Sequence, residues 1–221
     1  MMKTKKAIIF GTGSIAELAH FYLTNDSEYE VAAFTVDKQY IEEDGFIDLP
    51  LVPFEDVETI YDPRNYEMFI ALSYASLNKI RENKYNESKN KGYILLSYIS
   101  SKAINFSQSI GDNCFILEDN TIQPFVEIKN NVTLWSGNHI GHHSIIESHN
   151  FIASHAVISG HCNIKSNSFI GVNATIRDGI TIENENIIGA GSLILKNTKE
   201  KEVYAAKKTD VFPRSSDRMK I

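Results

Sequence analysis

Residues 140–176 read IGHHSIIESHNFIASHAVISGHCNIKSNSFIGVNATI, and the spacing of their aliphatic residues continues in both directions. An isoleucine or leucine stands at every sixth position from Ile104 to Ile194, and fifteen of these sixteen residues are isoleucine. A helix repeats about every 3.6 residues and a half-buried strand about every two, so neither explains an unbroken period of six. A coil with three short strands per turn does explain it. The sequence therefore predicts a parallel β-helix in which residues 18 apart lie one above the other.

The residue three places after each aliphatic position indicates where the chain turns. Most of these residues are Gly, Asn, Asp or His, the types that best tolerate a positive φ. They are Ser107, Asn113, Asp119, Phe125, Asn131, Gly137, His143, His149, His155, His161, Asn167, Asn173, Gly179, Glu185 and Gly191. The pattern predicts a left-handed corner and is similar to that of the hexapeptide-repeat, left-handed β-helix proteins.

The first 98 residues show a different pattern, in which short apolar strands alternate with helical segments. Strands are expected at 7–10, 31–35, 68–73 and 93–99, with helices after the first strand and at about 77–91. This alternation predicts a small α/β unit with a Rossmann-like parallel sheet. We therefore expect a Rossmann-like nucleotide-sugar-binding domain at 1–98, a left-handed β-helix at 99–196 and a C-terminal cap or tail at 197–221.

A glycine-rich turn connects the first strand to its helix. Gly11, Gly13 and Ser14 lie where backbone N–H groups at the start of a helix can hold a phosphate, and Asp37 is placed as a ribose ligand. The alternative is a tight turn that serves only strand and helix packing. Because only half of a dinucleotide fold is present, we expect a nucleotide-sugar diphosphate rather than NAD.

Composition and charge exclude several classes of protein. The net charge of −6 argues against a nucleic-acid partner, which needs clustered Lys and Arg. The two cysteines, Cys114 and Cys162, have no metal-ligand or redox spacing and fit a reducing compartment. The apolar run near the start is too short for a signal peptide, and no 18-residue apolar stretch occurs. We expect a cytoplasmic protein without membrane partners.

Six of the seven histidines lie between positions 139 and 161. Four of them occupy the left-handed corner register, so backbone tolerance alone explains their positions. His139 and His142 are off this register, which favours a role for their side chains, and the ordinary pKa of histidine suits proton transfer near neutral pH.

A metal site is a further alternative, because the γ-class carbonic anhydrases share the β-helix and bind zinc through three histidines, two of them five residues apart. No two histidines here are five apart, and we expect no metal. A different zinc geometry is left open, since His143 and His161 are 18 apart and would stack at one corner.

The chain resembles, essentially end to end, the bacterial UDP-4-amino-sugar N-acetyltransferases and sialic acid O-acetyltransferases. The resemblance rests on four segments, IIFGTGSIAE (8–17), SGNHIGHHS (136–144), FIGVNATI (169–176) and IIGAGSLILK (187–196). It implies that His142 is the general base and that the Gly160 amide is the oxyanion donor. The spacing agrees, because Gly160 follows His142 by 18 residues, which makes them vertical neighbours.

The resemblance also implies the ligands and the assembly. Acetyl-CoA, or another acyl-CoA, would contact Phe151, Gly160, Val172 and Ala190, and its phosphates would meet Lys207 and Lys208. The acceptor would be a nucleotide-linked amino sugar held by the glycine turn, Asp37 and His139. The family is trimeric and implies a homotrimer that acts in cell-surface polysaccharide biosynthesis.

The sequence departs from the family in four places. His143 stands where an acidic partner usually follows the base, and Phe151 matches a second family histidine. Ser14-Ile15 replaces Gly-His in the phosphate turn, and residues 205–208, AAKK, stand where Gly-x-Pro-Ala-Lys is usual. What orients His142 is therefore open. Sugar O-acetylation, a γ-carbonic-anhydrase-like metalloenzyme and a catalytically silent scaffold are the alternatives to N-acetylation.

Overall fold

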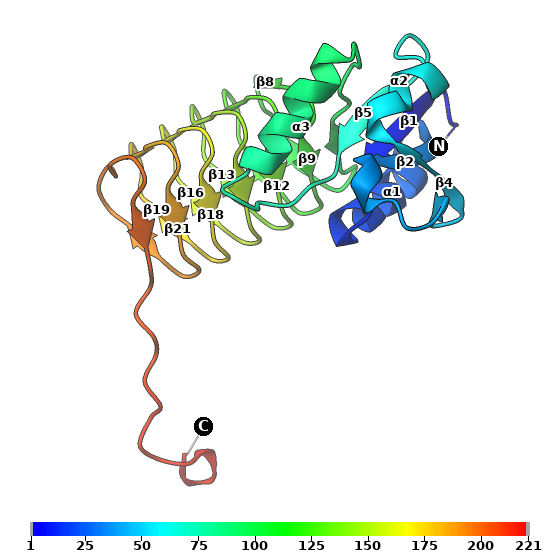
Figure 1. The fold of residues 1–221 in the computed structure, drawn as a ribbon. Helices are drawn as coiled ribbons and strands as arrows, with labels where there is room; N and C mark the ends of the chain where they lie inside the picture. Colours follow the sequence, from blue (N-terminus) through cyan, green and yellow to red (C-terminus); the bar gives the residue numbers. More distant parts are fainter. Residues whose placement is uncertain (1, 220–221) are drawn as a thin grey trace.

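The six-residue repeat forms a three-sided left-handed parallel β-helix in the computed structural model, which describes residues 2–219 (Figure 1). Each side is a parallel sheet, and we name the three sides after the strands of one coil. The β13 face contains β7 (Ile104–Asn105), β10 (Thr121–Ile122), β13 (His139–Ile140), β16 (Val157–Ile158), β19 (Thr175–Ile176) and β22 (Leu193–Ile194). The β14 face contains β8 (Ser109–Ile110), β11 (Glu127–Ile128), β14 (Ile145–Ile146), β17 (Asn163–Ile164) and β20 (Thr181–Ile182). The β15 face contains β6 (Tyr98–Ile99), β9 (Phe115–Ile116), β12 (Thr133–Leu134), β15 (Phe151–Ile152), β18 (Phe169–Ile170), β21 (Ile187–Ile188) and β23 (Val203–Tyr204).

The aliphatic residues of the repeat fill the interior of the β-helix, as predicted. From Ile116 to Ile194 they are at most 3% exposed, and Ile110 at the open end is partly buried. The first position is an exception. Ile104 pairs with Thr121 rather than with Ile122, so its side chain points outward and is 55% exposed. The strand is shifted by one residue at the end of the β-helix, where no coil below fixes the register.

The left-handed corner is present at fourteen of the fifteen predicted positions, with φ between 51° and 77°. Ser107, in the first coil, is the exception. The four corner histidines, at positions 143, 149, 155 and 161, all have positive φ. Their backbone therefore adopts the conformation that the sequence pattern predicted.

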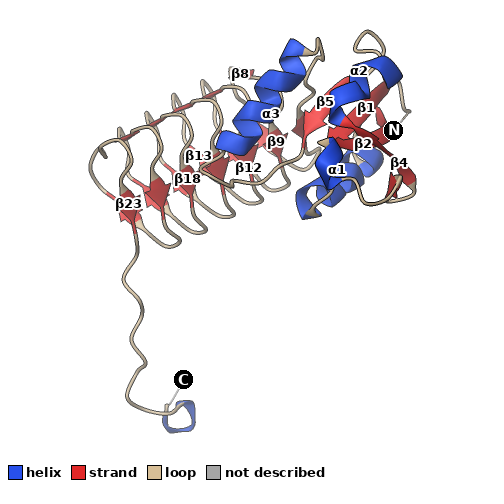
Figure 2. Ribbon diagram, viewed as in Figure 1, coloured by secondary structure: helices blue, strands red, loops and turns tan. Residues whose placement is uncertain are grey.

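The N-terminal unit is a five-stranded sheet with the order β3-β4-β2-β1-β5, which confirms the predicted α/β fold (Figure 2). Its elements are β1 (Lys5–Phe10), α1 (Ser14–Asn25), β2 (Tyr29–Val36), β3 (Gly45–Phe46), β4 (Leu49–Pro53), α2 (Val57–Ile60), β5 (Glu67–Ile70) and α3 (Lys79–Asn90), with short 3-10 turns at Lys38–Tyr40 and Phe54–Asp56. The strand predicted at 93–99 is wrong. Leu95 forms one isolated bridge to Met68, and Tyr98–Ile99 belongs to the β-helix as β6. The antiparallel β3–β4 hairpin was not predicted.

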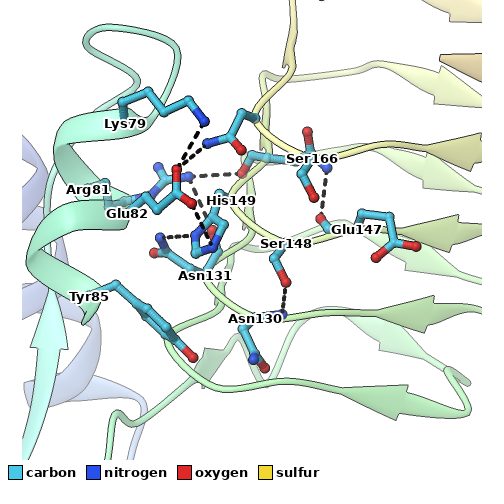
Figure 3. Close-up of polar contacts among 12 residues, drawn as sticks. Lys79, Arg81, Glu82, Tyr85, Asn130, Asn131, Glu147, Ser148, His149 and Ser166 are labelled. Carbon is cyan, nitrogen blue, oxygen red and sulfur yellow. Dashed lines mark hydrogen bonds and ion pairs between the residues drawn. The ribbon is translucent and has the colours of Figure 1, made fainter. Parts of the chain in front are cut away.

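Helix α3 packs against the β-helix along the corner between the β14 and β15 faces (Figure 3). Glu82 accepts a hydrogen bond of 2.8 Å from Asn167 Nδ2 and lies 3.6 Å from His149 Nε2. Arg81 is 1% exposed and donates to the carbonyl oxygens of Asn131 and Asn150. These contacts join the two units through buried polar groups as well as apolar packing.

The C-terminal segment begins with one more strand of the β-helix. Strand β23 pairs in parallel with β21 and extends the β15 face, and the chain then leaves the β-helix (Figure 1). A 3-10 turn at Ser216–Arg218 is the last element described. Across residues 2–219, none of the helices has the length and apolar character required to span a membrane.

Candidate active site

His142 lies at the corner between the β13 and β14 faces, in the turn that connects those two strands. Its backbone is fixed on both sides. The His142 N–H donates to Gln123 Oε1 at 2.9 Å, and its carbonyl oxygen accepts the His161 N–H at 2.9 Å. The side chain is exposed. The imidazole is therefore held on a rigid coil and faces solvent.

The imidazole of His142 lies against Gly160 in the next coil. A Cβ atom on Gly160 would stand 2.9 Å from His142 Cε1 and 3.0 Å from His142 Nε2, so only glycine leaves room for the ring. Gly160 is buried, and its N–H has no hydrogen-bond partner among residues 2–219. The structure thus brings together an imidazole nitrogen and a free backbone donor, as the 18-residue spacing predicted.

Asp178 is a third member of this column that the sequence reasoning missed. Its Oδ1 atom stands 3.0 Å from the same Cβ position on Gly160, so the carboxylate and His142 Nε2 flank one point. A carboxylate here can attract a cationic amine toward the imidazole. The signal was in the sequence, because Asp178 follows Gly160 by the same 18 residues that separate Gly160 from His142.

His143 contacts His142 directly. The two Nδ1 atoms are 3.1 Å apart, so one nitrogen donates a hydrogen and the other accepts it. When His143 accepts, the hydrogen of His142 is on Nδ1, and the lone pair of His142 is on Nε2, the atom beside Gly160. His143 thus stands where an acidic partner was expected and contacts His142 through Nδ1.

His161 completes a cluster of three histidines. Its ring stacks on that of His143 at a centroid distance of 4.9 Å and an interplanar angle of 17°. It meets the His142 ring edge-on at 5.0 Å. One nitrogen from each of the three rings lies within 4.8 Å of the others. His139 is not part of this cluster; it lies on β13, where it pairs with Thr121 and Val157.

The residues expected to bind acyl-CoA are not all brought to this corner. Val172 and Ala190 lie at the corner between the β15 and β13 faces, on the opposite edge of the β13 face from His142. Lys207 lines a cavity of about 300 Å³ beside β22 and β23, and Lys208 follows it in the exposed tail. Within one chain, these residues and the histidine cluster form separate surfaces.

Phe151 has no free surface for a ligand in this structure. It is 5% exposed and packs against Tyr74, Trp135 and Phe169, with the Arg81 guanidinium 5.8 Å from the ring centroid. It lies on the β15 face, which the N-terminal unit covers. The structure therefore places Phe151 in the packing between the two units and away from the histidine cluster.

The glycine turn opens onto a cavity of about 330 Å³ in the N-terminal unit, which Gly11, Gly13, Asp37 and Lys84 line. Gly11 has a φ of 124°, and a Cβ there would stand 2.9 Å from Ala71 O, so its role in the turn is structural. Gly13 faces open space. Ser14 begins α1 and does not line the cavity.

Asp37 is already paired in this cavity. Lys84 Nζ donates to Asp37 Oδ1 at 2.6 Å. Burial lowers the pKa of Lys84, but its hydrogen bonds to Asp37 and Glu87 outweigh burial and raise the pKa above its usual value. A charged ammonium group therefore lies at the wall of the cavity beside the predicted ribose ligand.

Comparison with known proteins assigns the fold. Residues 161–196 match the family model described as bacterial transferase hexapeptide (six repeats). No curated protein matches by sequence. In its fold the chain is similar to solved acetyltransferases of the hexapeptide-repeat type. This confirms the fold predicted from the sequence.

Three solved structures illustrate the similarity. The acetyltransferase domain of PglB from Neisseria gonorrhoeae has a TM-score of 0.78 and 19% identity, over 90% of this chain and 96% of that one. It has also been solved with acetyl coenzyme A. PerB from Caulobacter crescentus, a perosamine N-acetyltransferase, was solved with CoA and GDP-perosamine. It has a TM-score of 0.76 and 17% identity, over 93% of this chain and 94% of that one. WeeI from Acinetobacter baumannii has a TM-score of 0.57 and 15% identity, over 86% of this chain and 96% of that one.

Proposed function

We propose that the protein transfers the acetyl group of acetyl-CoA to the amino group of a nucleotide-linked amino sugar. The observation that carries the proposal is the position of His142 over the free amide of Gly160. The fold supports it, because PerB was solved with CoA and GDP-perosamine and the PglB domain with acetyl coenzyme A.

The chain's own groups account for each proton in this reaction. The sugar amine attacks the thioester carbonyl carbon while His142 Nε2 takes a proton from the amine nitrogen. The Gly160 N–H donates to the oxyanion that forms, and the C–S bond then breaks as the sulfur takes the proton back from His142. General bases contribute about 10²–10⁴-fold and oxyanion donors about 10²–10³-fold in typical enzymes. No metal is needed in this scheme.

The cavity beside the glycine turn suits the nucleotide part of the acceptor. The Gly13 backbone faces open space, and Lys84 supplies a positive charge at the wall. A diphosphate would find N–H donors at the start of α1 and one cation nearby. We also propose that His139 and Asp37 contact the nucleotide-linked amino sugar.

A homotrimer explains why the predicted acyl-CoA residues and His142 lie apart in one chain. Both groups border the β13 face, whose outward residues include Ile104, Val157 and Leu193, at 55%, 39% and 61% exposure. The outward residues of this face also include Thr121, His139 and Thr175. Packing copies through it would bring the His142 corner of one chain toward Val172 and Ala190 of another. Light scattering after gel filtration measures this assembly directly.

We place the protein in the cytoplasm, where acyl-CoA and reduced, buried cysteines are both expected.

The test is a mass-spectrometric assay of tag-free protein with acetyl-CoA and a panel of nucleotide-linked amino sugars. We expect one sugar to gain an acetyl group, at nitrogen by fragmentation, and acetylation at oxygen would replace the proposal with its alternative. His142→Ala should lose turnover but still bind acetyl-CoA. Full activity in His142→Ala would remove His142 from the mechanism.

A further inference from the structure

We propose that His142, His143 and His161 form a site for a divalent transition-metal ion such as Zn²⁺, and that the bound ion blocks His142 as a base. The second half of this proposal rests on the proposed function, and the first half does not. It differs from the γ-class arrangement considered above, because no two of these histidines are five residues apart.

The distances suit a metal. Zinc binds imidazole nitrogen at about 2.0–2.1 Å, so two nitrogens of a tetrahedral site lie about 3.3 Å apart. The Nδ1 atoms of His142 and His143 already stand at 3.1 Å, and one nitrogen from each of the three rings lies within 4.8 Å of the others. Because His161 is exposed, a turn of its side chain closes the remaining gap without moving the backbone.

The coils hold the backbones of the three histidines in place before any ion binds. His143 and His161 share the left-handed register, with φ of 57° and 55°, and their rings stack. Phe125, one coil earlier in the same register, packs under His143 at a centroid distance of 4.7 Å. The hydrogen bond from the His161 N–H to the His142 carbonyl ties the third histidine to the pair. Little conformational entropy is lost when a ligand set is held in this way.

One side of the cluster is open to a metal ion. The next residue in the same register is Gly179, which has no side chain, and apart from its two chain neighbours no residue has an atom within 4 Å of its Cβ position. An ion with its remaining waters can therefore reach the cluster from this side. Imidazole ligands suit Zn²⁺, Cu²⁺, Ni²⁺ and Co²⁺ rather than Mg²⁺ or Ca²⁺, which prefer oxygen.

Metal binding and proton transfer exclude each other at His142. The nitrogen that faces His143 is Nδ1, so it is the nitrogen that would bind the ion. A neutral imidazole bound through Nδ1 carries its hydrogen on Nε2. Nε2 then has no lone pair to take the proton of the sugar amine, and the enzyme is inactive until the ion leaves.

The decisive experiment is a Co²⁺ titration of chelated, tag-free protein, followed by visible absorption and by displacement with Zn²⁺. We expect one ion per chain and the spectrum of a four-coordinate site. His161→Asn should weaken binding at least about tenfold. Asparagine keeps the backbone, because Asn131 and Asn167 occupy the same register type with φ of 58° and 59°. His155→Asn, the matched control, should bind as the wild type does. Absence of stoichiometric binding, or unchanged binding in His161→Asn, would overturn the site.

Activity separates the two halves of the proposal. Zn²⁺ should abolish acetyl transfer in the wild type and a chelator should restore it. Metal binding together with full acetyl transfer in the loaded protein would overturn the blocking role. Metal binding in a protein that acetylates no sugar, loaded or chelated, would refute the proposed function and leave the metal site standing.

Discussion

The imidazole of His142 lies against the backbone of Gly160 in the next coil, and the space between them is too small for a Cβ atom. This contact links the sequence repeat to chemistry. The period of six places residues 18 apart one above the other. At this corner it places the His142 imidazole, which has a nitrogen that can accept a proton, over the Gly160 N–H, which has no hydrogen-bond partner among residues 2–219.

In the proposed mechanism, Gly160→Ala should reduce acetyl transfer by about 10²-fold or more, because the new Cβ would meet His142 at 2.9–3.0 Å and displace the proposed base from the proposed oxyanion donor. The φ of Gly160 is not among the positive values, so alanine imposes no backbone strain. The melting temperature should change little, and steady-state kinetics with acetyl-CoA measures the loss. A normal kcat in the Gly160→Ala enzyme would show that this contact has no part in catalysis.

His143 acts as a positioning residue in this scheme, and two substitutions separate its possible roles. His143→Glu restores an acceptor for the His142 Nδ1 hydrogen, whereas His143→Phe removes it. Both side chains are tolerated at this corner, since Glu185 and Phe125 hold the same register with φ of 58° and 67°.

We expect His143→Phe to lower kcat at least about tenfold with little change in KM, because His142 loses its fixed tautomer. His143→Glu should stay within a few fold of the wild type. Equal activity of the two variants would mean that His143 serves only the backbone turn.

The sequence predicted those features that the repeat itself determines. Each coil sees the same neighbours above and below, so the six-residue period is enough to place the interior residues and the left-handed corners. It failed at Ile104, where the first coil lacks a neighbour that would fix the register. The same arithmetic would have found Asp178, which shares a column with His142 and Gly160.

The contacts between the N-terminal unit and the β-helix could not be predicted from the six-residue period. No period relates α3 to the β-helix, so the burial of Arg81 and the packing of Phe151 beneath Tyr74 could not be read from spacing. Phe151 was assigned to acyl-CoA by resemblance, and the structure shows it covered by another part of the chain. A pairwise side-chain contact such as that of His142 with His143 likewise depends on rotamers that a repeat does not specify.

Arg81 should be one of the residues on which stability depends most. It is 1% exposed, donates to Thr133 Oγ1 and to the carbonyls of Asn131 and Asn150, and burial lowers its pKa to about 10. Arg81→Met removes the donor to the Asn131 carbonyl and to Thr133 Oγ1, while the Asn150 carbonyl keeps the Thr133 N–H at 3.0 Å. This loss should cost about 3 kcal/mol and lower the melting temperature by about 6–12 °C.

Lys79→Met is the matched control for Arg81→Met. Lys79 lies on the same helix and forms ion pairs with Glu82 and Glu185, but its side chain is 44% exposed. Exposed pairs contribute about 0–1 kcal/mol, so its melting temperature should change by no more than a few degrees. Comparable losses in the two variants, measured by calorimetry, would refute a special role for the buried guanidinium.

The contact between α3 and the β-helix should weaken in acid. Burial lowers the pKa of His149 below its ordinary value of 6.5, an effect that the Glu82 and Asp112 carboxylates oppose and the Arg81 and Lys79 charges reinforce. The folded protein therefore favours neutral His149, whereas the unfolded chain takes up a proton below about pH 6.5. The stability that this difference provides is present above pH 6.5 and is lost as the pH falls from 6.5 through the lower folded pKa.

His149→Asn removes this titration and keeps the corner backbone, since Asn131 adopts the same conformation one coil earlier. The wild type should lose stability between pH 7.5 and 5.5 more steeply than the variant, by up to about 1.4 kcal/mol per pH unit. Denaturant unfolding at a series of pH values measures both slopes, and His155→Asn makes the same change at an exposed corner. Because Glu82 titrates only in more acidic solution, its pKa being lowered from 4.5, it does not contribute to this range. Parallel slopes for the wild type and His149→Asn would show that His149 is not the group that couples this contact to pH.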